Sequence, residues 1–122
     1  MGAIAFSKKP EESWVVAGWA FRQILDDVAA QYPNDAEMIK ELNDAKALGG
    51  LMVYFLPPDI AARVLDAIKH VVSGILSGTI KTGLGSHPYG DKSTLQEYKV
   101  GLQQLLGVIP STSAPPRTPG TA

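Results

Sequence analysis

A long, largely apolar segment between Pro57 and Gly78 constrains the fold of this chain more than any other feature. Apolar residues cover most of its circumference at the helical period of about 100° per residue. Its polar residues fall in one narrow stripe: Asp59, Arg63, Asp66, His70, Ser73 and Ser77. Because such a helix is not stable alone in water, other elements must pack around it. The segment therefore predicts a helical domain built around residues 57–78.

The stretch from Pro10 to about Gln31 also has helical spacing. It starts with a proline and two acids, which are typical of a helix N-terminus. Its apolar stripe includes Trp14, Phe21 and Leu25. We expect the first helix here, after a short lead over residues 1–9 in which residues 3–6 form either a brief strand or a loose end.

Two more helices are expected further along the chain. One follows the break at Pro33, with Asn34 as its N-cap, and the glycine pair 49–50 either ends it or kinks it. The other runs from about 93 to 108 with a regular leucine stripe, and either Asp91 or Ser93 caps it.

The apolar run 51–56 lies between those glycines and a proline pair, and its periodicity does not separate a buried strand from a buried helical turn. A strand needs an edge to pair with, and residues 3–6 are the only candidate. We therefore favour a helical continuation.

Together these segments predict an all-α fold, a compact four-helix bundle-like domain around the central helix 57–78. Residues 1–109 form the single domain. Residues 110–122 are rich in Pro, Thr and Ser and contain no apolar side chain larger than Ala. We expect them to be a flexible tail, because they bury too little to offset the entropy of ordering. Its Pro116–Pro119 match to a PxxP motif arises easily by chance in such a composition.

The composition narrows the classes of function. The chain has no Cys, which excludes disulfides, thiolate metal sites and a Cys nucleophile, and which fits a cytoplasmic location. The net charge is −1 with the two signs interspersed, so we expect no nucleic-acid partner. No apolar run approaches the roughly 20 residues that span a bilayer, so we expect no membrane partner. The charged fraction is 19%, against about 25% in typical chains, which favours a surface covered by another chain.

The sequence contains no recognisable catalytic, cofactor or metal motif. Asp66 and His70 lie four residues apart and share one helix face, so they are a candidate polar site, although a local ion pair is the simpler interpretation. The glycines of segment 78–86 match only the first half of a phosphate-binding loop, because Leu84 and Gly85 stand where Lys and Ser or Thr are needed. We therefore expect no cofactor and no metal.

A candidate partner-binding patch lies on the far side of the predicted first helix. Val15, Val16 and Trp19 fall outside the stripe of Trp14, near Arg22. Such a patch is covered either by the same chain or by a partner, and Trp and Arg are enriched at interface hot spots.

The leading hypothesis is a non-enzymatic protein–protein interaction module that presents a rigid helix face. It would be a small regulator, an inhibitor, an immunity-like protein or an accessory subunit of a larger assembly. Its partner would be another protein or a second copy of itself in a homo-oligomer. The alternative is a small-ligand-binding bundle or an enzyme with a pocket between the helices, near Asp66 and His70. Five aromatic residues would line that pocket: Trp14, Phe21, Tyr54, Phe55 and Tyr98.

Overall fold

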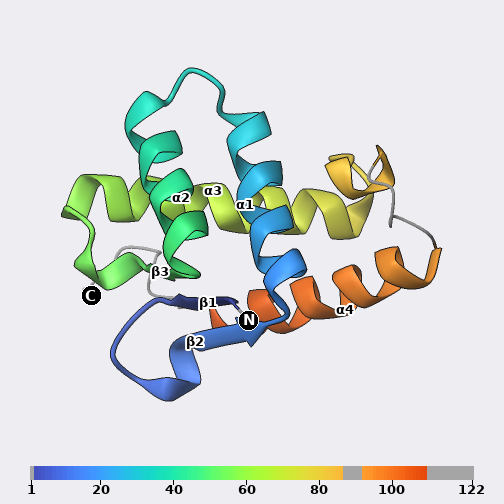
Figure 1. Cartoon of the computed structure of the whole chain (residues 1–122), viewed down its shortest axis with the longest axis horizontal. Helices are drawn as coiled ribbons and strands as arrows, with labels where there is room; N and C mark the ends of the chain where they lie inside the picture. The colour runs from blue at the N-terminus through green and yellow to red at the C-terminus, as the bar shows by residue number, and fades with distance from the viewer. Residues whose placement is uncertain (1, 87–91, 110–122) are drawn as a thin grey trace, which may run out of the picture.

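The computed structural model describes residues 2–86 and 92–109, which fold into four helices and a three-stranded sheet (Figure 1). The helices are α1 (Gly18–Gln31), α2 (Ala36–Leu48), α3 (Pro58–Ser77) and α4 (Lys92–Val108); the strands are β1 (Gly2–Ala5), β2 (Ser13–Val16) and β3 (Gly50–Met52). Single 3₁₀ turns, η1 to η3, cover Pro10–Glu12, Val53–Phe55 and Gly83–Ser86. Figure 1 shows α1 and α2 next to each other and crossing α3, with the sheet and α4 on the same side of α3.

The central helix is confirmed. Pro57 and Pro58 start α3, and Gly78 ends it with φ of 87°, a left-handed conformation that favours glycine. Its apolar positions are buried: Ile60, Val64, Ala67, Ile68, Val71, Val72, Gly74 and Ile75. The predicted polar stripe is exposed or half-buried along its whole length. The helix packs against α1, α2 and α4, as its nearly continuous apolar surface requires.

The prediction of an all-α four-helix bundle is wrong, because the chain also forms a mixed sheet in the order β2-β1-β3. Strand β1 pairs antiparallel with β2, with Ile4 opposite Trp14. It pairs parallel with β3, with Ile4 opposite Leu51. The fold is therefore mainly helical with a small sheet that closes one end.

Strand β2 lies where the first helix was expected to begin. Within it Trp14 is 3% exposed and Val15 is 59% exposed, while Val16 is half-buried against α4. This alternation has the period of a strand, and β-branched and aromatic residues are favoured there. Pro10–Glu12 forms only one 3₁₀ turn, and α1 begins at Gly18.

Two local predictions are also corrected. The 51–56 run does not continue a helix: Leu51 and Met52 belong to β3, and a 3₁₀ turn follows. The strand forms because β1 supplies the edge that it needs. The N-cap of α2 is Asp35 rather than Asn34, since the Asp35 side chain accepts a hydrogen bond from the Met38 amide at 3.2 Å. The predicted Asp91 cap and the 110–122 tail lie outside the described residues.

The inner face of the sheet joins the core. Ile4, Trp14 and Leu51 form one buried row across the three strands. At Gly2, a Cβ atom would lie 2.2 Å from Cγ of Phe21, so only glycine allows this approach of β1 to α1. The Trp14 indole N–H donates to the carbonyl of Gly101 at 3.0 Å, which anchors the sheet to α4.

Candidate functional site

The four predicted partner-binding residues do not share one helix face. Val15 lies on the outer face of the sheet and is exposed, whereas Val16 lies on the inner face, where a Cβ on Gly101 of α4 would be 3.9 Å from it. Trp19 and Arg22 lie on α1; Trp19 is half-buried and Arg22 is exposed. The structure thus divides the predicted patch among the outer face of the sheet, its inner face and the first half of α1.

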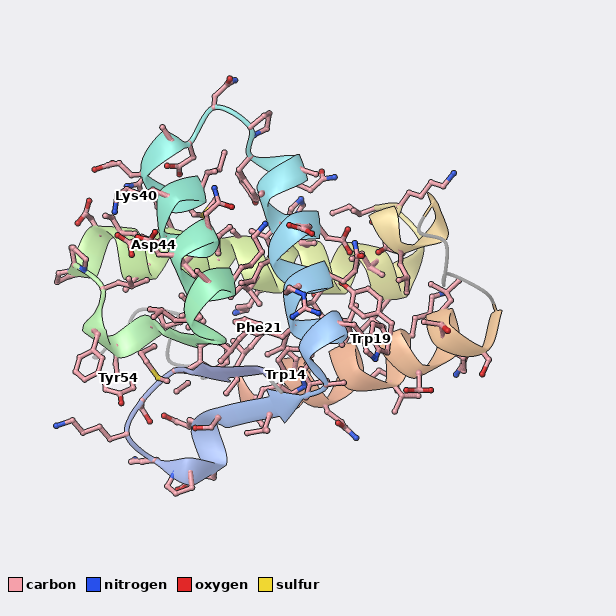
Figure 2. All side chains as sticks on the ribbon, in the orientation of Figure 1. Trp14, Trp19, Phe21, Lys40, Asp44 and Tyr54 are labelled. Atoms are coloured by element: carbon pink, nitrogen blue, oxygen red, sulfur yellow. The ribbon has the colours of Figure 1, made fainter. Side chains whose placement is uncertain are left out.

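The five aromatic residues of the alternative pocket are not brought together either. Trp14, Phe21 and Tyr98 are buried core side chains, whereas Phe55 is 73% exposed and Tyr54 is also exposed. Figure 2 shows Tyr54 at the margin of the molecule, away from Trp14 and Phe21. The rings of Tyr54 and Phe55 contact only each other, among the ring pairs of the described residues, with centroids 4.5 Å apart.

Asp66 and His70 are both exposed on α3, and no hydrogen bond or ion pair joins them in the described part of the chain. The His70 ring instead meets the edge of Tyr32, with centroids 6.5 Å apart. Within residues 2–86 and 92–109, no group of three or more His, Cys, Asp or Glu side chains is placed to hold a metal ion. No carboxylate is hydrogen-bonded to the His70 ring among the described residues.

An ion-pair cluster surrounds Arg63 where α3 passes the start of α2. Its guanidinium donates to both carboxylate oxygens of Asp35 at 2.8 Å and to Glu37 at 2.9 Å, and Asp59 lies 3.8 Å away. The hydrogen bond to Glu37 is the main reason that the pKa of Arg63 is raised. Because Asp35 also caps α2, the cluster fixes that helix start on α3, which is a structural role.

The most enclosed polar cluster in the described ranges centres on Asp27, which is only 5% exposed. One oxygen, Oδ1, accepts from the amide of Gly83 at 2.8 Å and from Nε2 of Gln23 at 3.0 Å. The other, Oδ2, accepts from the hydroxyls of Tyr98 at 2.8 Å and Thr82 at 2.5 Å. A buried carboxylate needs several donors, and the described residues supply four to this one. Asp27 therefore ties the segment after α3 and the helix α4 to α1.

The environment of Tyr98 follows from this cluster. Burial, followed by the negative charge of Asp27 and the hydrogen bond to it, raises the pKa of the Tyr98 hydroxyl far above its ordinary value. A hydroxyl held neutral in this way is a poor nucleophile and a poor base. Within the described residues, the members of the cluster are hydrogen-bonded to one another, which supports a role in stability.

The buried Tyr98 makes a testable prediction about alkaline pH. Because its folded pKa is raised, its contribution to stability is complete below the ordinary tyrosine value of about 10 and is lost as the pH rises above it. We expect unfolding free energies from denaturant titrations to fall more steeply above that pH in the wild type than in Tyr98→Phe. Parallel curves for the two proteins would contradict a buried, neutral Tyr98.

A groove lies between the first half of α1 and the end of α2. It holds about 460 Å³ and is lined by Trp19, Arg22, Gln23, Asp26, Lys46 and Ala47. Lys46 crosses it to pair with Asp26 at 2.6 Å. Trp19 also contacts Tyr98, with ring centroids 6.2 Å apart. The groove therefore contains two of the residues predicted to bind a partner, Trp19 and Arg22.

Large apolar side chains are exposed mainly around the sheet. Among the described residues, seven large hydrophobic side chains are exposed, and five lie on the sheet or beside β3: Val15, Leu48, Met52, Tyr54 and Phe55. We refer to these five as the apolar surface. Leu48 and Phe55 are the most exposed, at 84% and 73%. The segment 47–58, which contributes four of the five, has no charged residue.

Comparison with known proteins gives no relative for this chain: it matches no family model, no curated protein and no solved structure. None of the helices in the described ranges is both long enough and apolar enough to cross a membrane.

Proposed function

We propose that this chain is a non-enzymatic protein–protein interaction module, which acts as a small regulator or inhibitor or as an accessory subunit of a larger assembly. The apolar surface is the observation that carries the proposal. Isolated exposed hydrophobic residues are ordinary on a protein surface, but a concentration of them within one uncharged segment is typical of interfaces.

The arrangement of the apolar surface also favours binding. Met52 lies beside Ala5 and Val15 lies beside Ala3, so the two side chains point to the same open face of the sheet. The other residues that the pairing places on this face are uncharged: Ala3, Ala5, Ser13 and Gly50. Ala5 is 9% exposed. A partner that covers it desolvates few polar groups, which keeps the cost of association low.

Two substitutions on the apolar surface test the proposal. We expect Leu48→Ser with Phe55→Ser to weaken association about tenfold or more, because each side chain loses the gain from apolar burial. The measurement combines light scattering of the purified chain, which detects a second copy, with quantitative capture of partners from native lysate.

The matched control is Val100→Ser with Leu106→Ser, which removes two exposed apolar side chains from α4 instead. Both double variants should keep the helical circular dichroism of the wild type. Equal association by the wild type and the Leu48/Phe55 variant would rule out the apolar surface as the binding site.

A further inference from the structure

The groove between α1 and α2 presents hydrogen-bond donors that have no acceptor in the part of the chain that the structure describes. Arg22 is exposed, and its guanidinium makes no hydrogen bond or ion pair within residues 2–86 and 92–109. The indole N–H of Trp19 is likewise without an acceptor in the described structure, although its ring is half-buried. The other tryptophan differs, since Trp14 donates to a backbone carbonyl. Half-buried indole N–H groups usually find a partner.

The one carboxylate among the groove's lining residues is already paired with one of the two cations. The carboxylate of Asp26 accepts from Lys46 at 2.6 Å. The amide of Gln23 donates away from the groove, to the buried Asp27. Two cations and one carboxylate line the groove, so one positive charge remains, and it belongs to Arg22. The chemistry that complements this surface is a carboxylate, which can accept a bidentate hydrogen bond from a guanidinium.

The form of the groove indicates the kind of molecule that carries the carboxylate. Pockets for small molecules enclose most of their ligand, whereas this groove is partly open to solvent. Ala47 lines it, and Leu48 of the apolar surface is the next residue. A protein partner that contacts Leu48 would therefore lie close to the Ala47 end of the groove. Tryptophan and arginine are the side chains most often found at interface hot spots.

We propose that Trp19 and Arg22 form a recognition site for an acidic segment of a protein partner. An aspartate or glutamate side chain of that segment would pair with Arg22 and accept the Trp19 indole N–H. The inference rests on the proposed function in one respect, namely that the carboxylate belongs to a protein.

A peptide titration of the full chain tests this site. The probe is a hexaglutamate peptide, and the readout is the pair of indole N–H signals in a ¹H–¹⁵N spectrum. The Trp19→Phe variant assigns the two signals. We expect the Trp19 signal to move with added peptide while the Trp14 signal stays in place, and we expect hexaglutamine to move neither. An unmoved Trp19 signal at saturating peptide would overturn the proposal.

Variants that change the net charge by the same amount distinguish specific recognition by Arg22 from a general electrostatic attraction. We expect Arg22→Gln to weaken peptide binding about tenfold and Arg22→Lys to weaken it less. Lys8→Gln changes the net charge equally on the exposed β1–β2 connection and should have little effect. Equal losses in Arg22→Gln and Lys8→Gln would overturn the proposal.

Two further titrations identify the source of the carboxylate and distinguish a failure of the Trp19 and Arg22 site from a failure of the apolar surface. Citrate that shifts the Trp19 signal as strongly as the peptide would show a small-anion site instead of a site for a protein segment. The Leu48→Ser, Phe55→Ser chain should still bind hexaglutamate. Loss of partner capture in that chain, with peptide binding kept, therefore reports on the apolar surface alone.

Discussion

Replacing Asp27 with Ala lowers the free energy of unfolding by about 3 to 5 kcal/mol. The substitution removes the acceptor for four donors at once. Gly83 and Gln23 donate through N–H groups, which cannot act as acceptors instead. The hydroxyl of Tyr98 stays buried and loses its acceptor. Urea denaturation followed by circular dichroism measures the loss.

Asp27→Asn is the matched control for this prediction. Its amide oxygen can keep the bonds from Gly83 and Gln23, while its NH₂ group donates to the hydroxyl oxygens of Tyr98 and Thr82, since hydroxyls accept as well as donate. We expect a loss of only about 1 kcal/mol. Equally small losses of unfolding free energy in Asp27→Ala and Asp27→Asn would contradict the assignment of Asp27 as the residue that holds the segment after α3 and α4 against α1.

Replacing Trp14 with Ala costs a similar amount, about 3 to 5 kcal/mol. The indole ring is 3% exposed and fills the space between β2 and α4, so its removal leaves a cavity and breaks the hydrogen bond from the indole N–H to the Gly101 carbonyl. Trp14→Phe keeps much of the packing and loses the hydrogen bond, and we expect it to cost about half as much. The same denaturation experiment measures both variants.

The comparison with the other tryptophan tests the assignment of the two residues. Trp19 is half-buried and its indole N–H has no acceptor among the described residues, so Trp19→Ala should cost about 1 kcal/mol. A larger loss at Trp19 than at Trp14 would contradict the structure, because it would make Trp19 the core residue.

The helices could be predicted because their apolar stripes extend over many residues. Helix α3 has eight buried residues and an unbroken polar stripe, with a proline start and a glycine end. The sheet could not be predicted in the same way, since its strands have only three or four residues. In so short a segment the alternation of Trp14 and Val15 also fits a helix. Only the pairing with β1 shows that the segment is a strand.

The candidate site was harder to predict, because most of it depends on contacts between distant residues. Trp19 and Arg22 were identified from their types, but Lys46 and Asp26 come beside them only through the packing of α2 on α1. Asp27 was missed altogether. In the sequence, Asp27 lies three residues after Ile24 and next to Val28, and both of these are on the buried face of α1. Helical spacing therefore puts the Asp27 carboxylate on the same buried face.

The central claim is that the apolar surface binds a protein, and site-specific photo-crosslinking tests it most directly. A photoreactive amino acid is placed at Phe55 or, in a second chain, at the exposed Gln103 of α4. Both chains are irradiated in cells that naturally express the protein. We predict one discrete crosslinked species, with a protein partner or a second copy of the chain, from position 55 and none from position 103. Position 55 free of crosslinks, or the same diffuse products from both positions, would contradict the claim.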